Sequence, residues 1–234
     1  MPGFTVTPGT RTRGVGVSQS PRDRRHAYDH GVGVHSEIDR TPPAFTAAVE
    51  QLGRAVLRPE VVIDTMPAPQ RIAPFAHAVS GDVLTGATGP GLSAGGDELG
   101  TGRFILLHDP AGNDAWGGTF RCVTFARADV EPEMAADPSL PTVGWSWLTD
   151  ALDSHGGEYI APSGSVTVVH TEGFGEMAAD GSDAQIEVRA SWTPSSDDMG
   201  AHISAWSDLL CALAGLPPLA PGVIPLQSRR RGAR

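Results

Sequence analysis

A histidine, two aspartates and a tryptophan occur close together near the middle of the chain, between residues 108 and 116. An imidazole that a carboxylate orients can act as a general base, and the same groups can take part in a metal site. His108, Asp109 and Asp114 are therefore the candidate catalytic residues. The alternative, which the pattern favours, is that His108 ends a strand and Asp109 begins a turn, because neighbours along a strand point to opposite faces.

The segments around these residues predict a β-hairpin. The β-prone runs 103–107 and 119–125 flank residues 108–118, which are rich in Pro, Gly, Asn and Asp. A segment of this composition between two β-prone runs is typical of a hairpin loop. The sequence thus predicts that the candidate catalytic residues lie at the tip of a hairpin.

Four side chains are candidates for holding a ligand or a partner: Arg71, Trp116, Arg121 and Trp145. Arginine is suited to binding anions, although a surface or salt-bridging role fits both arginines better. The other tryptophans fall on apolar stripes of predicted elements, which indicates core positions. Trp116 and Trp145 do not, so either one could cap a groove or a partner surface.

Two further patterns resemble known sites but lack the surroundings that those sites need. Residues 91–95 match the G-x-S-x-G pattern of a hydrolase nucleophile elbow, which requires a strand before the serine and a helix after it. Their Gly-rich, aperiodic flanks indicate a chance match. His26, His30 and His35 would need an ordered segment to hold a metal, and the glycines between them disfavour a helix. We expect no metal and no cofactor.

All 17 basic residues of the chain are arginine, and there is no lysine. Walker-A phosphate loops, pyridoxal Schiff bases and the strand lysine of protein kinases all need an ε-amino group. The composition therefore excludes these three classes of protein.

The charge of the chain is unevenly distributed. Residues 41–228 hold seven arginines against 23 acidic residues, a net charge of −16. A body this acidic repels phosphate backbones, so we do not expect nucleic acid to bind to it. The Arg-rich ends of the chain could contact RNA or an acidic partner, but their composition favours disorder.

Hydropathy and cysteine usage predict where the protein resides. No apolar run reaches the ~18 residues of a membrane span, and the N-terminus lacks the apolar region of a signal peptide. Cys122 and Cys211 lie among apolar neighbours, which favours buried free thiols over a disulfide or a zinc site. We therefore expect a cytoplasmic protein without membrane contact.

Length and periodicity predict one α+β domain over residues 42–218, between a disordered segment, 1–41, and a flexible Arg-rich tail, 219–234. The predicted order is a helix, four strands, a helix, two strands and a helix. Strands joined by short turns favour antiparallel pairing. The expected fold is a two-layer antiparallel sheet with helices on one face.

The apolar spacing also predicts details of the helices. A helix over residues 43–58 is expected to bury Val56, and the second helix is expected to bury Val143. Either Asp197 or Asp198 is suited to cap the last helix, because an aspartate there accepts from a free backbone N–H and faces the positive end of the helix dipole.

Proline, glycine and alternation predict the strands. A strand over residues 70–79 is expected to lie at an edge or to contain a bulge, because Pro74 has no N–H to donate to a neighbour. The Gly-rich residues 80–102 predict a mobile loop. Residues 184–192 alternate between apolar and polar side chains, which is typical of an antiparallel strand with one wet face.

Several separated segments resemble an actinobacterial family catalogued as domain of unknown function number 3000: residues 58–60, 69–74, 106–110, 115–116, 145–148, 189–193 and 214–218. The resemblance spans about residues 43–218. It implies an intracellular protein and brings no known activity with it. Genes of this family often lie near a gene for a ribonuclease-D-like exonuclease, which implies a link to RNA metabolism. The predicted order of elements is similar to that of secretion-chaperone-like domains, which bind peptides and often dimerise.

Three functions are compatible with these observations. The leading hypothesis is a non-enzymatic binding or adaptor protein that forms a homodimer and engages a protein or peptide partner. The second is an enzyme that uses His108 as a base, oriented by Asp109 or Asp114. The third is an accessory of RNA metabolism, motivated by the Arg-rich ends of the chain and by the gene context of the family.

Overall fold

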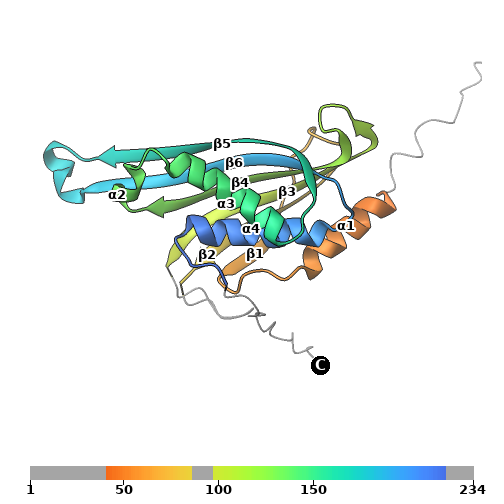
Figure 1. Cartoon of the computed structure of the whole chain (residues 1–234), viewed down its shortest axis with the longest axis horizontal. Coiled ribbons are helices and arrows are strands. Elements are labelled where there is room, and N and C mark those ends of the chain that lie inside the picture. The colour runs from red at the N-terminus through yellow and green to blue at the C-terminus, as the bar shows by residue number, and fades with distance from the viewer. Residues whose placement is uncertain (1–40, 86–96, 220–234) are drawn as a thin grey trace, which may run out of the picture. The chain divides into compact units, whose positions relative to one another are not determined.

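The computed structural model describes residues 41–85 and 97–219, in which a β-sheet carries helices on one of its faces (Figure 1). The predictions for the N-terminal histidines, for residues 91–95 and for the two ends of the chain lie outside these residues. The elements, in chain order, are α1 (Pro43–Arg54), β1 (Val61–Met66), β2 (Phe75–Leu84), β3 (Glu98–Asn113), β4 (Gly118–Val130), α2 (Pro132–Ala135), α3 (Leu140–Ser154), β5 (Tyr159–Glu172), the 3-10 helix η1 (Gly175–Asp180), β6 (Ser182–Pro194) and α4 (Met199–Leu213).

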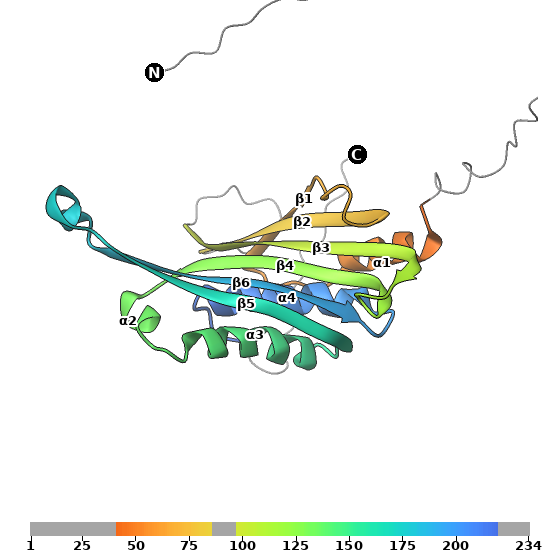
Figure 2. The ribbon, with the colours of Figure 1, turned by 90° about the horizontal axis from the view of Figure 1, so that it is seen from above.

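The six strands pair in the order β1-β2-β3-β4-β6-β5, and every neighbouring pair is antiparallel. The predicted α+β fold class is thus confirmed, with the short helices α2 and η1 added to the predicted order. Figure 2 shows the β5–β6 hairpin projecting beyond the other strands, with η1 at its tip. None of the described helices is long and apolar enough to cross a membrane.

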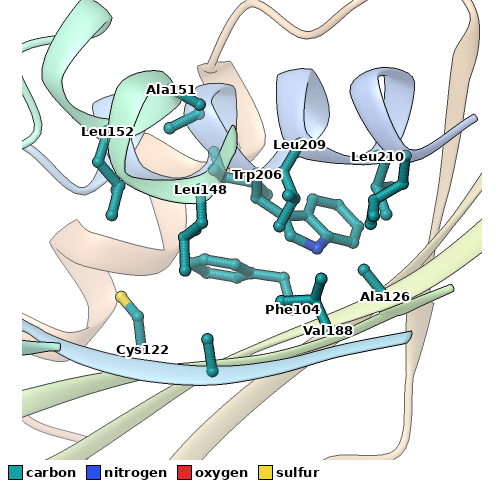
Figure 3. Close-up of a cluster of buried hydrophobic side chains, with 14 of the residues drawn as sticks. Phe104, Cys122, Ala126, Leu148, Ala151, Leu152, Val188, Trp206, Leu209 and Leu210 are labelled. Atoms are coloured by element: carbon teal, nitrogen blue, oxygen red, sulfur yellow. The ribbon is translucent and has the colours of Figure 1, made fainter. Parts of the chain in front are cut away.

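The core lies between the sheet and the helices, and α4 forms its centre. Figure 3 shows Trp206, Leu209 and Leu210 of α4 pointing toward the apolar side chains of the strands. Asp198 caps this helix by accepting a hydrogen bond from the N–H of Ala201 at 3.2 Å, as one of the two predicted caps. Most side chains of α4 are buried, including polar ones that an amphipathic pattern does not predict.

The predicted loop over residues 80–102 is wrong at both ends, because β2 continues to Leu84 and β3 already begins at Glu98. Gly81, Gly100 and Gly102 of this stretch lie in the sheet. A Cβ atom on Gly81 would come within 2.6 Å of the Trp206 ring, and one on Gly102 within 2.5 Å of Leu210. Glycine in these strands permits the close approach of α4.

The predictions for the strand with Pro74, for Val56 and for Val143 are also corrected. Pro74 precedes β2, which lies inside the sheet and not at its edge, so its missing N–H interrupts no ladder. Helix α1 ends at Arg54, which leaves Val56 44% exposed. On α3 Gly144 is buried, with its Cβ position 3.0 Å from the Ile186 side chain, while Val143 is 38% exposed, so the expected burial of Val143 is wrong.

The predicted hairpin is confirmed, but its strands are longer and its tip is shorter. Strands β3 and β4 pair regularly as far as His108↔Phe120, and then again at Asn113↔Gly118. The turn itself spans residues 114–117. Cys122 on β4 and Cys211 on α4 are buried free thiols, as predicted, and burial raises the pKa of both.

Candidate functional site

Alternate side chains of the central strands point away from the helices and define what we call the open face of the sheet. Residues that face the helices, among them Phe104 on β3 and Val188 on β6, are fully buried. Their neighbours along each strand point to the opposite face, because side chains alternate in a strand. The open face carries Arg103 on β3, Arg121 and Arg127 on β4, and Arg189 on β6.

The strand register lines up several of these side chains across the sheet. Arg103 pairs with Phe125, Phe125 with Arg189, and Arg189 with Ser165. Neighbouring strands lie about 4.8 Å apart. This row therefore places the Arg103 guanidinium on one side of the Phe125 ring and the Arg189 guanidinium on the other. The Arg189 guanidinium carbon lies 5.5 Å from the centre of the Phe125 ring, which is a cation–π contact.

An open groove of about 870 Å³ runs along this face. We call it the arginine groove and define it by the side chains that distinguish it: Arg103, Phe125, Arg127, Ser163, Arg189 and Ser191. Ligand sites are typically concave and combine apolar area with a few convergent polar groups. The arginine groove has this composition.

The guanidinium groups of the groove are only partly neutralised by neighbouring carboxylates. Arg189 Nε donates to Glu187 Oε1 at 2.8 Å. Arg103 and Arg127 are exposed and form no ion pair within the described part of the chain. The groove is therefore a cationic surface on a body whose net charge is strongly negative.

Arg121 lies at the end of this groove and is buried, with 7% of its surface exposed. Its Nη1 donates to Ala161 O at 3.0 Å and to Thr193 Oγ1 at 2.9 Å. Its Nη2 donates to Ser191 O at 3.2 Å, to Ser191 Oγ at 2.8 Å and to Ser163 Oγ at 3.2 Å. Burial lowers the pKa of Arg121, but arginine stays charged at neutral pH. All these acceptors are neutral oxygens.

Two of the predicted site residues, Arg121 and Trp116, lie close together, joined by Thr193. The Thr193 hydroxyl accepts from Arg121 and donates to the backbone oxygen of Trp116 at 2.7 Å. The hairpin tip is thus fastened to β6 beside the buried guanidinium. Trp116 contributes its carbonyl to this link, and its side chain is half-buried.

The structure places His108 in an aromatic cluster on the helix face. Its ring stacks on Phe120, with centroids 4.2 Å apart, and also neighbours Phe45 and Phe75. Nδ1 lies 3.0 Å from Thr119 O, so it carries the proton that it donates to this carbonyl. Burial lowers the pKa of His108 and favours the neutral ring. Its hydrogen bond stabilises the hairpin, and no carboxylate orients the ring.

Neither candidate carboxylate joins His108 in a catalytic arrangement. Asp109 Oδ1 accepts from the N–H of Ala111 at 3.1 Å, which is the local turn interaction that the sequence favoured. Asp114 lies exposed in the turn at the hairpin tip. His108 and Asp109 therefore lie within β3, which continues to Asn113, and Asp114 lies in the turn, so the expectation that His108 ends a strand and Asp109 begins a turn is wrong.

Arg71 and Trp145 lie apart from the arginine groove. Arg71 is exposed in the loop between β1 and β2 and has a positive φ of 69°. Trp145, on α3, packs against the helix-facing side of β5 beneath Gly164. Trp145 therefore belongs to the core boundary, although the sequence predicted a partner surface.

Replacement of Gly164 with alanine is expected to lower the free energy of unfolding by about 2 kcal/mol. A Cβ atom there would collide with the backbone oxygen of Arg189, and it would lie 2.8 Å from the Trp145 ring. Urea denaturation measures the change. Gly53→Ala on α1 is the control, because nothing lies within 4 Å of its Cβ position, and we expect it to stabilise the helix slightly. Equal effects of the two substitutions would contradict this account of Gly164.

The sequence patterns did not identify the residues of the arginine groove. They did identify Arg121, which lies beside the groove. Arg121 and Arg127 share one strand face by their spacing, and Arg103 falls on the matching face of the predicted hairpin partner. This alternation was available in the sequence. Ser163 and Ser191 carried no comparable signal, because their approach to Arg121 depends on the pairing of β4, β6 and β5.

Comparison with known proteins identifies a family and no individual relative. No curated protein and no solved structure matches the chain. A family model described as "Protein of unknown function (DUF3000)" matches residues 41–224, which covers every described element and most of the chain. The chain therefore belongs to the DUF3000 family of proteins of unknown function.

Proposed function

We propose that this protein is a non-enzymatic binding domain that holds an acidic, extended segment of a partner protein in the arginine groove. One observation carries the proposal. Three of the seven arginines in residues 41–228 line the groove, and no acidic side chain is among its lining residues, although the same stretch holds 23 acidic side chains. A concave surface of one charge sign raises the local concentration of ligands of the opposite sign.

The spacing of the groove suits an extended peptide that runs along the strands. Arg127 lies one row beyond the row of Arg103 and Arg189, because it pairs with Thr101 and Glu187. Successive side chains on one face of a strand are about 6.8 Å apart, and alternate side chains of an extended peptide have the same repeat. Carboxylates at every second position of a bound segment would therefore meet successive rows of the groove.

A protein segment fits this surface better than a nucleic acid does. The Phe125 ring, which is the aromatic side chain of the groove, is already covered by the Arg189 guanidinium. Stacking on exposed aromatic rings is the main source of affinity for single-stranded nucleic acids, and this arrangement supplies little of it.

The binding test uses a labelled peptide with glutamate at every second position and its glutamine counterpart. Fluorescence anisotropy is expected to show binding of the glutamate peptide alone, with an affinity that falls as salt rises. The Arg103→Ala/Arg127→Ala double variant should bind about tenfold more weakly, which corresponds to roughly 1.4 kcal/mol for two exposed charge pairs.

Arg54→Ala is the matched control, because Arg54 is equally a surface arginine but lies on α1 and pairs with Glu50. It should leave the affinity for the glutamate peptide unchanged. The absence of binding at low salt would overturn the proposal, and so would an equal loss of affinity in both variants. Tighter binding of a single-stranded RNA than of the peptide would also overturn it.

Two earlier expectations stay predictions beside this proposal. β1 and β5 are the edge strands of the sheet, and an edge strand offers backbone groups that a second chain can pair with. A homodimer is compatible with such an edge, and the cytoplasmic location is likewise a prediction from composition.

A further inference from the structure

The buried charge of Arg121 has no counter-charge among the described residues. The guanidinium of a buried arginine usually pairs with a carboxylate, because transfer of an unpaired charge out of water is costly. Arg121 instead donates to five neutral oxygens through the four N–H groups of Nη1 and Nη2, and no carboxylate of the described chain lies within ion-pair distance of it. Its positive charge is therefore available to an anion at the groove surface.

Two serine hydroxyls separate this charge from the groove. Ser163 Oγ and Ser191 Oγ both accept from Arg121 Nη2, and both side chains line the arginine groove. A hydroxyl has one proton to donate besides its two lone pairs. The two oxygens lie 3.4 Å apart, which is a long contact between them. Because Arg121 occupies lone pairs, these hydroxyls are polarised to donate their protons toward a ligand in the groove.

The backbone of β5 is shaped to hold Ser163 in this position. The register between β5 and β6 shifts between Ile160 and Ser163, so β5 carries a bulge there. Ala161 within the bulge has a φ of +50°, which alanine rarely adopts, and its oxygen accepts from Arg121 Nη1. After the bulge, Ser163 stands directly opposite Ser191. The hydroxyl pair is thus a product of local backbone geometry.

The surrounding charge determines which anion fits. Arg189, on the same strand and face as Ser191, also lines the groove, and Arg103 lies in the same row as Arg189. Hydroxyl donors beside guanidinium groups suit an oxyanion with several acceptor oxygens. A single carboxylate would neutralise only one of the unpaired charges of Arg103 and Arg121, whereas a phosphate monoester brings close to two negative charges and three acceptor oxygens.

We propose that Ser163 and Ser191, with Arg121 behind them, form a subsite for a phosphate monoester on the segment that occupies the arginine groove. The occupant is a phosphorylated serine or threonine of the acidic partner segment. This inference rests on the proposed function, because the same segment supplies the carboxylates that meet Arg103 and Arg127. It adds that the partner is recognised in its phosphorylated form.

The test compares the glutamate peptide carrying one central phosphoserine with the same peptide carrying serine. The protein is expected to bind the phosphoserine peptide about tenfold more tightly. The Ser163→Ala/Ser191→Ala double variant should lose this preference and bind the two peptides with equal affinity. Ser165→Ala is the matched control, because Ser165 lines the groove on the same strand but makes no hydrogen bond to Arg121. It should retain the preference.

A second measurement uses the unmodified protein, in case the double variant does not fold. In a two-dimensional amide NMR titration with inorganic phosphate, the signals of Ser163 and Ser191 are expected to shift, and chloride at equal ionic strength should not shift them. Equal affinity for the two peptides, or no phosphate-specific shift, would overturn the subsite and leave the proposed function intact. Failure of both peptides to bind would overturn the proposed function.

Discussion

Replacement of Arg58 with alanine is expected to lower the free energy of unfolding by about 3 kcal/mol, because it removes one partner of a buried ionic network. Arg58 is 4% exposed and lies between α1 and β1. Its Nε and Nη2 donate to the two oxygens of Glu60 at 3.1 and 2.9 Å, and Nη2 also donates to Pro217 O at 3.1 Å. Its Nη1 lies 3.8 Å from Asp208 Oδ1.

The loss is large because the buried guanidinium is the donor that holds these partly exposed groups together. Without the guanidinium, the carboxylates of Glu60 and Asp208 repel each other, and the carbonyl of Pro217 loses a donor. Burial raises the pKa of Glu60, but the hydrogen bond from Arg58, a backbone hydrogen bond and the charge of Arg58 together hold the pKa below its ordinary value. Arg58 therefore fastens the chain before β1 and the chain after α4 to each other.

Urea denaturation of the purified variants measures this effect. Arg58→Lys should lose less stability than Arg58→Ala, because an ammonium keeps the charge but cannot make the two-pronged contact with Glu60. Arg54→Ala removes an exposed ion pair one turn away on α1 and should change the stability by no more than about 0.5 kcal/mol. A loss at Arg58 that is no larger than the loss at Arg54 would refute the role assigned to this network.

The second large effect is a loss of stability in acid that comes from His202. This side chain is fully buried on α4, and its Nδ1 accepts from the indole N–H of Trp192 at 3.2 Å. Protonation of Nδ1 would set two donors against each other in a fully buried site. Burial accordingly lowers the pKa of His202 from 6.5 to about 4, although the charge of Asp198 works in the opposite direction.

The direction of the pH dependence follows from this shift. Between pH 6.5 and about 4 the unfolded chain binds a proton at His202 that the folded protein does not bind. The contribution of neutral His202 to the free energy of unfolding is therefore complete above pH 6.5 and is lost as the pH falls toward 4. The difference between the ordinary pKa of His202 and its pKa in the folded protein corresponds to about 3 kcal/mol of unfolding free energy. Glu60 adds an acid loss of its own only near and below its ordinary pKa of 4.5.

Stability measured by urea denaturation across this pH range isolates the contribution of His202. His202→Leu should be less stable than the natural protein at neutral pH, but its stability should fall by about 3 kcal/mol less on acidification. His170→Gln, at an exposed position of β5, should follow the natural protein. Parallel curves for the natural protein and His202→Leu would show that His202 does not titrate as its burial requires.

The elements that the sequence predicted are those encoded by short-range patterns. The alternation in residues 184–192 correctly predicted which side chains of β6 are buried, and a capping aspartate marked the start of α4. The residue types around Asp109 correctly predicted a local hydrogen bond from its side chain to its own backbone segment. In each case the residues that interact lie within a few positions of one another, so their spacing alone carries the information.

Glycine misled the prediction of the strands, because its role here depends on contacts between residues that are far apart in the sequence. Gly81 and Gly102 are loop signals by local preference, yet each lies in a strand because α4 passes too close for a Cβ atom. The helix that requires them begins about a hundred residues later in the chain. The burial of His202 was likewise hidden, because α4 is enclosed by β6, α3 and α1 and has no polar face to set its pattern.

By itself, the sequence determined the two-layer fold class, the hairpin of β3 and β4, the acidic body and the strand faces on which the arginines lie. Only the tertiary structure decided that Arg103, Phe125 and Arg189 share a row, and that Ser163 and Ser191 meet the buried Arg121. Alternation is a property of one strand with a period of two residues. Register between β4, β6 and β5 is set by pairing across long stretches of chain, and the bulge before Ser163 shifts it by backbone geometry that composition does not reveal.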